Sequence, residues 1–190
     1  LIFINSMENS FEVVRMSKRT GKAITLTDLL DEIPVDAVRF LFNMREPGST
    51  MDFDLDLAVE ESSQNPVYYC QYANARICSI LRKLKEDGIT PRPCTREELE
   101  KLTEPEEKEL IRHLASLTDE IVLSAKNYDA ARITRYAITL ATLFHKYYNA
   151  CRIGVEDEAL MQARVCLCEC VRSVMVNILN AFSIETPDRM

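Results

Sequence analysis

Aromatic and basic side chains recur at helical spacing in the segment from residue 65 to residue 84. Tyr68, Tyr72, Arg76, Ser79 and Lys83 lie three or four residues apart, so a helix would place two phenol rings and two cations along one face. Phenol rings stack on flat groups and cations neutralise anions, so this face could bind an anionic ligand. The alternative is that both tyrosines only cover the core and leave their hydroxyl groups in water.

A second group of residues able to do chemistry is the basic segment Arg15-Met-Ser-Lys-Arg-Thr-Gly21, which directly follows a predicted strand. Arg15, Lys18 and Arg19 repel one another in the free state, and an anion such as a triphosphate among them would remove that repulsion. The alternative is a solvated basic turn. The residues alone leave both interpretations open.

Positive charge is concentrated in two segments of a chain that is acidic overall. The net charge is −7 and the pI is near 5.0. Residues 65–93 nevertheless carry five Lys and Arg residues against two acids, and residues 126–152 carry five against one. Because local charge governs contact with a polyanion, these two segments could present a positive face to a phosphate backbone.

The composition argues against several classes of protein. We expect a soluble, cytoplasmic protein, because no apolar run is long enough to span a membrane and no signal-peptide pattern opens the sequence. The seven cysteines show no C-x-x-C spacing, and the two histidines lie far from the cysteine-rich stretch. This arrangement predicts reduced thiols and no metal site.

Long amphipathic helices are expected to position these residues. Pro66 suits a first helical turn and Gly88 follows the last one, so a helix is predicted between them, with an apolar stripe beside the aromatic and basic stripe. Further helices are predicted to begin at Pro105, at Asp129 and near Glu156. Apolar stripes on helices joined by short loops predict a mainly α fold, an antiparallel helical bundle.

Two other predicted helices also have an apolar stripe. In the helix that begins at Pro105, the stripe ends at Ile121, with a break and restart at residues 118 and 119. In the last helix, the stripe consists of Leu160, Ala163, Leu167, Cys170, Val174, Ile178 and Ala181.

The first part of the chain is predicted to hold different elements. Residues 1–4 and 11–15 have the composition of a β-hairpin, and the Thr25-x-x-Asp28 spacing predicts the start of a short helix. Residues 52–57 alternate as a strand does, but Asp54 suits a helix N-cap, so a helix is predicted from Asp54 to Ser62. We expect residues 1–53 to be the remnant of a larger α/β domain and residues 54–190 to form the bundle.

Four segments occur in an order that is typical of one family. They are Met16-Ser-Lys-Arg-Thr-Gly21, then Phe53-Asp-Leu-Asp-Leu57 with Asn65-Pro-Val-Tyr-Tyr-x-Gln-Tyr-Ala-x-Ala-Arg-Ile77, then residues 129–132 with 144–152, and finally Pro187-x-Arg-Met190. Together they resemble the C-terminal part of the arginyl-tRNA synthetases, which are class I aminoacyl-tRNA synthetases. The first resembles a KMSKS-type loop, and the others resemble the helical anticodon-binding domain with its DALR region, although Ala131 stands where that motif has leucine.

The resemblance implies a role for each segment. Met16, Ser17, Lys18 and Arg19 would form an ATP-binding loop, in which Lys18 would stabilise the charge that develops on the phosphates during adenylate formation. The residues that would lie around the bases of the anticodon loop are Tyr72, Arg76, Tyr148, Asn149 and Met190. From their charge, Lys146 and Arg152 are also expected to bind tRNA, by neutralising its phosphates. The whole enzyme would ligate arginine to its tRNA with ATP and Mg²⁺, whereas this chain, without the rest of the catalytic part, is expected to bind tRNA but not to catalyse.

The expected partner is therefore an arginine tRNA, bound by a monomer that contacts neither DNA nor a membrane. The alternative function is a helical module for protein interaction or dimerisation without nucleic-acid binding. An exposed aromatic and basic face separates the two, because only tRNA binding needs it. His145 is expected to be a structural hydrogen-bonding residue, with direct contact to RNA as the alternative.

Overall fold

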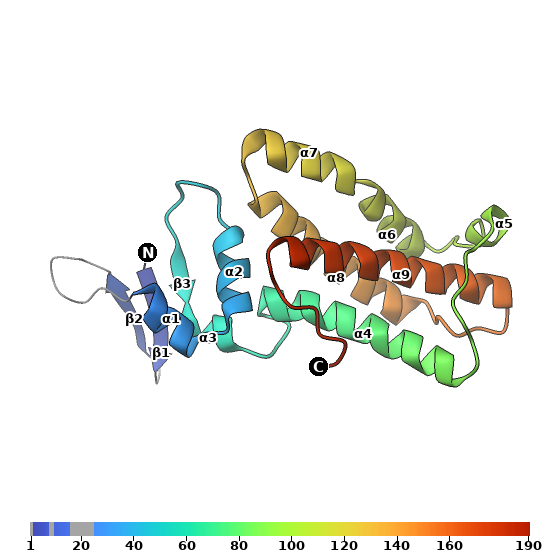
Figure 1. Cartoon of the computed structure of the whole chain (residues 1–190), viewed down its shortest axis with the longest axis horizontal. Coiled ribbons are helices and arrows are strands. Elements are labelled where there is room, and N and C mark those ends of the chain that lie inside the picture. Colours follow the sequence, from blue (N-terminus) through green and yellow to red (C-terminus); the bar gives the residue numbers. More distant parts are fainter. Residues whose placement is uncertain (1, 8–9, 16–24) are drawn as a thin grey trace.

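The computed structural model describes residues 25–190 in full and the backbone of residues 2–7 and 10–15. A small sheet lies at one end and long helices lie side by side at the other (Figure 1). The predicted ATP-binding loop, with Met16, Ser17, Lys18 and Arg19, lies outside the described residues. The predominance of helices confirms the predicted fold class.

In chain order the elements are β1 (Ile2–Met7), β2 (Ser10–Arg15), α1 (Leu26–Glu32), α2 (Val35–Asn43), β3 (Asp52–Asp54), α3 (Leu55–Val59), α4 (Pro66–Glu86), α5 (Arg96–Leu99), α6 (Pro105–Ala115), α7 (Leu117–Asn127), α8 (Ala131–Ala150) and α9 (Glu158–Ala181).

The sheet has the strand order β2-β1-β3. β1 and β2 pair antiparallel, which confirms the predicted hairpin. β3 runs parallel to β1. This third strand was not predicted, because the alternation at residues 52–57 was interpreted as the segment that leads into a helix. Phe53 is only 1 % exposed, and pairing with β1 supplies the backbone hydrogen bonds that so short a segment cannot make alone.

α3 has the predicted N-cap but ends earlier than predicted. The Asp54 carboxylate accepts a hydrogen bond from the Leu57 N–H at 3.0 Å. The helix ends at Val59, before the predicted Ser62. The buried Asn65 side chain explains the early end, because its amide donates to the Ala58 and Glu60 carbonyl oxygens and holds the chain in a turn.

α4 spans the predicted helix, and specific residues fix both of its ends. Asn65 caps the N-terminus through its side chain, and Pro66 occupies the first turn. At the other end Gly88 has a φ of 80°, a left-handed conformation that glycine adopts without strain. This turn lets the Ile89 N–H donate to the Leu84 carbonyl oxygen at 2.8 Å, as in a Schellman motif.

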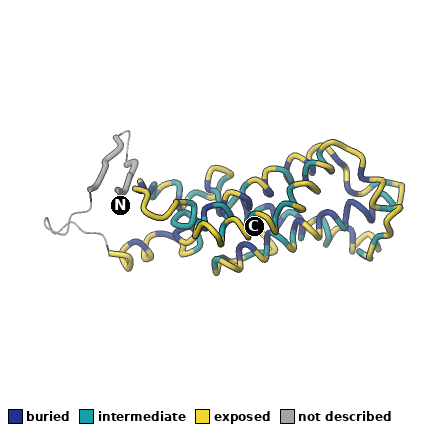
Figure 2. The backbone as a smooth tube through the Cα atoms, turned by 90° about the horizontal axis from the view of Figure 1, so that it is seen from above, coloured by how far each residue is buried: buried dark blue, intermediate teal, exposed yellow. Residues whose placement is uncertain are grey.

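One face of α4 packs against α8 and α9. Cys70, Ala73 and Ile77 on this face have an exposed fraction of 0 %. Buried positions recur along the inner sides of the long helices, and exposed positions lie on the outside (Figure 2). The predicted apolar stripe of α4 is therefore confirmed.

The structure corrects two other predicted stripes. The break between α6 and α7 comes at Ser116 rather than at residues 118 and 119, and Ile121 is 50 % exposed because α7 packs mainly against one neighbour, α8. In α9, Cys170 is exposed whereas Cys168 is fully buried. Because α4, α5, α6 and α8 all contact α9, its buried face is broader than the predicted stripe and is rotated away from Cys170.

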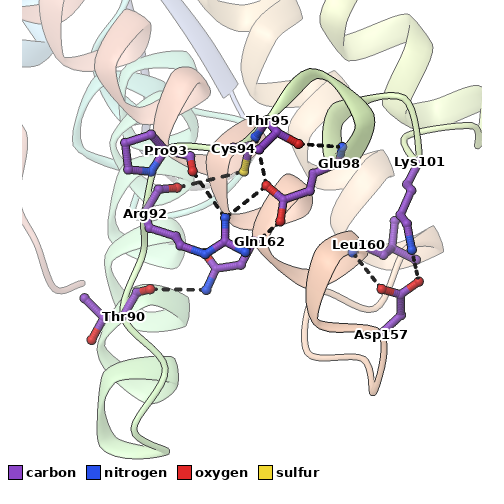
Figure 3. Close-up of polar contacts among 10 residues, drawn as sticks. All are labelled: Thr90, Arg92, Pro93, Cys94, Thr95, Glu98, Lys101, Asp157, Leu160 and Gln162. Carbon is purple, nitrogen blue, oxygen red and sulfur yellow. Dashed lines mark hydrogen bonds and ion pairs between the residues drawn. The ribbon is translucent and has the colours of Figure 1, made fainter.

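The connection from α4 to α6 is attached to α9 by side-chain hydrogen bonds (Figure 3). The Gln162 amide of α9 donates to the Thr90 carbonyl oxygen at 3.2 Å, and Lys101 forms an ion pair with Asp157. Within the connection, Arg92 donates to both carboxylate oxygens of Glu98, at 2.6 and 2.9 Å. These bonds fix a segment of little regular structure against the last helix.

The seven cysteines all lie in the described part of the chain, and none of them forms a disulfide. Burial raises the pKa of the Cys168 thiol to about 12, so this thiol stays protonated at neutral pH and packs as a small apolar group. Between residues 25 and 190, no helix has the length and apolar character needed to cross a membrane, and no cluster of His, Cys, Asp and Glu side chains could hold a metal ion.

A buried ion pair joins α6, α9 and the loop after α8. Arg164 Nε lies 2.7 Å from Glu107 Oε1, and the side-chain exposed fractions are 9 % and 0 %. The same guanidinium donates to the Arg152 carbonyl oxygen at 2.7 Å, and the second Glu107 oxygen accepts from the Glu104 N–H at 2.9 Å. Both charged groups thus have the hydrogen-bond partners that their burial requires.

Replacing Glu107 by alanine should lower the free energy of unfolding by about 3–5 kcal/mol, because the Arg164 charge would stay buried without its partner. Urea unfolding followed by circular dichroism measures this change. The matched control is Glu109→Ala, which removes a solvent-exposed ion pair with Lys146 and should have a much smaller effect. Equal losses in the two variants would contradict the assignment of the Glu107 pair to the core.

Candidate nucleic-acid interface

The guanidinium of Arg76 lies between two tyrosine rings. Its Cζ atom is 4.7 Å from the ring centroid of Tyr72 and 4.9 Å from that of Tyr148. Tyr72 stands one turn before Arg76 on α4, and the Tyr72 hydroxyl accepts a hydrogen bond from Arg76 at 2.8 Å. Tyr148 comes from α8. We call these three residues the Tyr–Arg–Tyr cluster, in which a cation and two π-faces hold one another in place.

His145 packs against the Tyr–Arg–Tyr cluster, with its ring centroid 5.7 Å from that of Tyr72. Its side chain is buried, with an exposed fraction of 8 %, and its ring centroid lies 4.8 Å from that of Tyr69. Burial, together with the neighbouring Arg76 cation, lowers the pKa of His145 to about 4. The ring is therefore neutral at pH 7, and we assign Nδ1, which lies 3.3 Å from an Arg76 nitrogen, as the acceptor. This placement agrees with the structural role predicted for His145.

Three hollows meet around the cluster and form a groove. The central hollow, of about 610 Å³, is lined by Tyr72, Arg76 and Tyr148 together with residues of α4 and of the chain end. The tyrosine hollow, of about 380 Å³, shares Tyr72 and Arg76 with it and extends to His145. The loop hollow, of about 720 Å³, shares Lys83 and Tyr148 with the central one and extends to the loop after α8. Volumes of this size can accept flat groups such as nucleobases.

The central hollow is basic. Its charged lining consists of Arg76, Arg82, Lys83, Arg189 and the single acid Asp188. The carboxylate of Asp188 already accepts a hydrogen bond from the Cys78 thiol at 3.1 Å and lies 3.4 Å from Arg172, and these contacts lower its pKa. No ion pair involves Arg76 or Lys83 among the described residues. Cations gathered in a concave site attract anions more strongly than the same charges on a flat surface.

Six of the seven residues predicted to bind tRNA line the groove, namely Tyr72, Arg76, Tyr148, Asn149, Arg152 and Met190. Lys146 is the exception. Its ammonium group forms an ion pair with Glu109 of α6 at 2.7 Å, and it lines none of the three hollows. The contacts of all seven with a ligand stay predictions, as do those of the loop around Lys18.

Three charged residues of the central hollow were not predicted to bind tRNA, namely Arg82, Asp188 and Arg189. Arg82 donates to the Asp188 carbonyl oxygen at 3.2 Å, across a sequence separation of 106 residues. Local periodicity contains no signal for a contact of this range. Arg82 could have been suspected only from its charge, whereas Arg189 lies in the segment Pro187-x-Arg-Met190 that carries part of the family resemblance.

The DALR anticodon binding domain family matches residues 70–190, which is more than half of the chain. The arginine–tRNA ligase of Ruminiclostridium cellulolyticum is 50 % identical over 179 residues, which cover 94 % of this chain and 32 % of that ligase. The arginine–tRNA ligase of Acetivibrio thermocellus is 49 % identical with the same coverage. The chain thus spans about a third of the length of these relatives.

Two solved structures have a similar fold. Arginyl-tRNA synthetase from Plasmodium falciparum has a TM-score of 0.70 at 22 % identity, covering 87 % of this chain and 29 % of that one. The Thermus thermophilus arginyl-tRNA synthetase has a TM-score of 0.68 at 23 % identity, covering 91 % and 29 %. At these identities the likeness concerns the fold.

Lowering the pH should destabilise the protein through His145. Its pKa is about 4 in the native state against 6.5 for the unperturbed group, so the unfolded state binds the proton more tightly. The contribution of this group to stability is present above pH 6.5 and is lost as the pH falls toward 4. Between pH 7.5 and 5.0 the wild type should lose about 2 kcal/mol more than His145→Asn. Urea unfolding at both pH values measures the difference, and equal losses would show that the native ring is not held neutral.

Proposed function

The chain belongs to the family of DALR anticodon-binding domains, and from this premise we propose that it binds the anticodon loop of an arginine tRNA as part of an arginine–tRNA ligase. The sequence identity of 50 % and 49 % with two arginine–tRNA ligases supports an arginine tRNA as the ligand. We further propose that it acts in the cytoplasm as a monomer and contacts neither DNA nor a membrane.

The observation that carries the proposal is the Tyr–Arg–Tyr cluster at the junction of three hollows. The bases of a tRNA loop are unstacked, and proteins bind such bases by stacking them on aromatic rings and by hydrogen bonds to their edges. Tyr148 is 38 % exposed and can offer a ring face to a base, while Arg76 fixes the orientation of that ring. Stacking costs little ordering entropy when the ring is already held.

The cations around the cluster would bind the phosphates that join successive bases. Lys83 lines both the central and the loop hollow, and Arg152 lines the loop hollow. A strand that follows the groove would therefore meet positive charge in both hollows that Tyr148 lines. This arrangement suits a continuous single strand better than an isolated small molecule.

The catalytic part of the proposal rests on the sequence. The whole ligase would use ATP with Mg²⁺, and in this chain Met16, Ser17, Lys18 and Arg19 would contact the nucleotide. Since the chain corresponds to about a third of the ligases that it matches, we propose that it binds tRNA but does not form the adenylate alone.

A helical module that only contacts proteins or forms dimers was the alternative considered from the sequence. Such a module would have no need for a hollow lined by Arg76, Arg82, Lys83 and Arg189 beside two tyrosine rings. The charge and the shape of the groove therefore favour RNA as the ligand.

Filter binding of the chain to an arginine tRNA and an unrelated tRNA tests the proposal. Tyr148→Ala should weaken binding of the arginine tRNA by about 1–3 kcal/mol and reduce discrimination between the two, because a base loses its stacking partner. Lys83→Ala, which removes a cation that lines both the central and the loop hollow, should weaken both tRNAs about equally, because a phosphate contact carries no sequence information. All affinities should fall steeply with added salt.

The control for this experiment is Arg96→Ala, which removes an exposed cation on α5, outside the groove, and should leave both affinities unchanged. If the wild type binds neither tRNA at low salt, or if Tyr148→Ala binds both as the wild type does, the groove is not the anticodon-binding surface.

A further inference from the structure

The last residues of the sequence fold back along α4. After α9, Ser183 adopts a left-handed conformation with a φ of 56°, and the Ile184 N–H donates to the Leu179 carbonyl oxygen at 3.0 Å. Ile184 is buried, with an exposed fraction of 2 %, so the turn is anchored in the core. The chain beyond it, drawn in red, crosses α4 and ends beside it (Figure 1). We call residues 184–190 the tail.

A buried asparagine on α4 holds the middle of the tail. The Asn74 side-chain amide donates to the carbonyl oxygens of Pro187 at 2.9 Å and of Thr186 at 3.3 Å. Asn74 has an exposed fraction of 0 % and lines none of the three hollows. The side-chain nitrogen of Asn74 is thus bound to the tail backbone and lies away from the surface that a ligand would contact.

The residues that follow this contact form a wall of the central hollow. Asp188, Arg189 and Met190 line it together with α4 residues and Tyr148 of α8, and they reach it because the tail lies along α4. Further hydrogen bonds hold the two sides of this contact: Arg82 donates to the Asp188 carbonyl oxygen, the Cys78 thiol to the Asp188 carboxylate, and the Gln71 amide to the Glu185 carbonyl oxygen. The tail is extended and makes no helix of its own, so its position depends on such contacts.

We propose that Asn74 is a positioning residue for anticodon recognition, acting through the tail. Its amide fixes Thr186 and Pro187 and thereby holds Arg189 and Met190 at the hollow where a base would bind. An asparagine suits this buried position, because its short side chain ends in an NH₂ group that can donate to both carbonyl oxygens. The inference rests on the proposed function for its ligand, whereas the contact between Asn74 and the tail is independent of it.

The test combines Asn74→Leu with removal of residues 186–190 in a double-mutant cycle. Asn74→Leu keeps the volume but leaves two carbonyl oxygens without their donor, so affinity for the arginine tRNA should fall about tenfold. Removal of the tail should reduce affinity at least as much. Asn74→Leu should then cause no additional loss in the shortened chain, because both changes act through the same segment. An equal loss in the full-length and shortened chains would overturn the proposal.

Hydrogen exchange measured by mass spectrometry reports on the tail without RNA. In Asn74→Leu, the amides of residues 184–190 should exchange faster, while those of α8 keep their wild-type protection. The matched control is Asn177→Leu, a substitution of an exposed asparagine on α9, which should change neither the tail nor tRNA binding. Unchanged exchange of the tail in Asn74→Leu would show that the amide does not hold it.

The two measurements separate the inference from the function on which it rests. If the wild type fails to bind the arginine tRNA, the recognition role of Asn74 falls together with the proposed function, even if the tail exchanges faster in the variant. If the wild type binds and the cycle is additive, the proposed function stands and the positioning role is wrong.

Discussion

The contact of α4 with α8 and α9 fixes the rotation of α4 about its own axis. Ala73 and Ile77 are fully buried in this contact, and each helical residue is turned by about 100° from the one before it. Tyr72 and Arg76, one position earlier in each turn, must therefore emerge at the edge of the contact and cannot turn away from α8. The same packing buries Phe144 and presents Tyr148, four residues later on α8, to the guanidinium. The Tyr–Arg–Tyr cluster is thus a consequence of core packing.

The distribution of ion pairs explains how an acidic chain keeps one basic groove. Acids of the segment from residue 94 to residue 125 lie on α5, α6 and α7, away from the groove. Two of them neutralise cations of α8: Glu109 pairs with Lys146, and Glu120 pairs with Arg132. Arg76 has tyrosine rings and a neutral histidine as neighbours instead. Lys146 and Arg132 are thus neutralised by local ion pairs, whereas the charge of Arg76 stays available to the groove.

The parts of the fold that sequence could predict are those with local signals. The limits of α4 follow from Asn65, Pro66 and Gly88, and its buried face follows from the helical period. The third strand, β3, could not be predicted, because its partner lies about fifty residues earlier and only pairing makes it a strand. For the site, Tyr72 and Arg76 were found from their types and spacing, and Tyr148 was found from the resemblance to a known family. Arg82 and Arg189 were not found, because the tail contact that gathers them leaves no periodic signal.

The docking of the tail sets an order in which the groove can be assembled. Asn74 and the carbonyl oxygens that it binds are separated by 112 and 113 residues, so their contact closes a long loop and forms only after the helices between them have packed. On the ribosome, α4 and α8 are made well before residues 186–190 emerge. A nascent chain can therefore hold Tyr72, Arg76 and Tyr148 in place while one wall of the central hollow is still missing, so the hollow is completed only after its helices have packed.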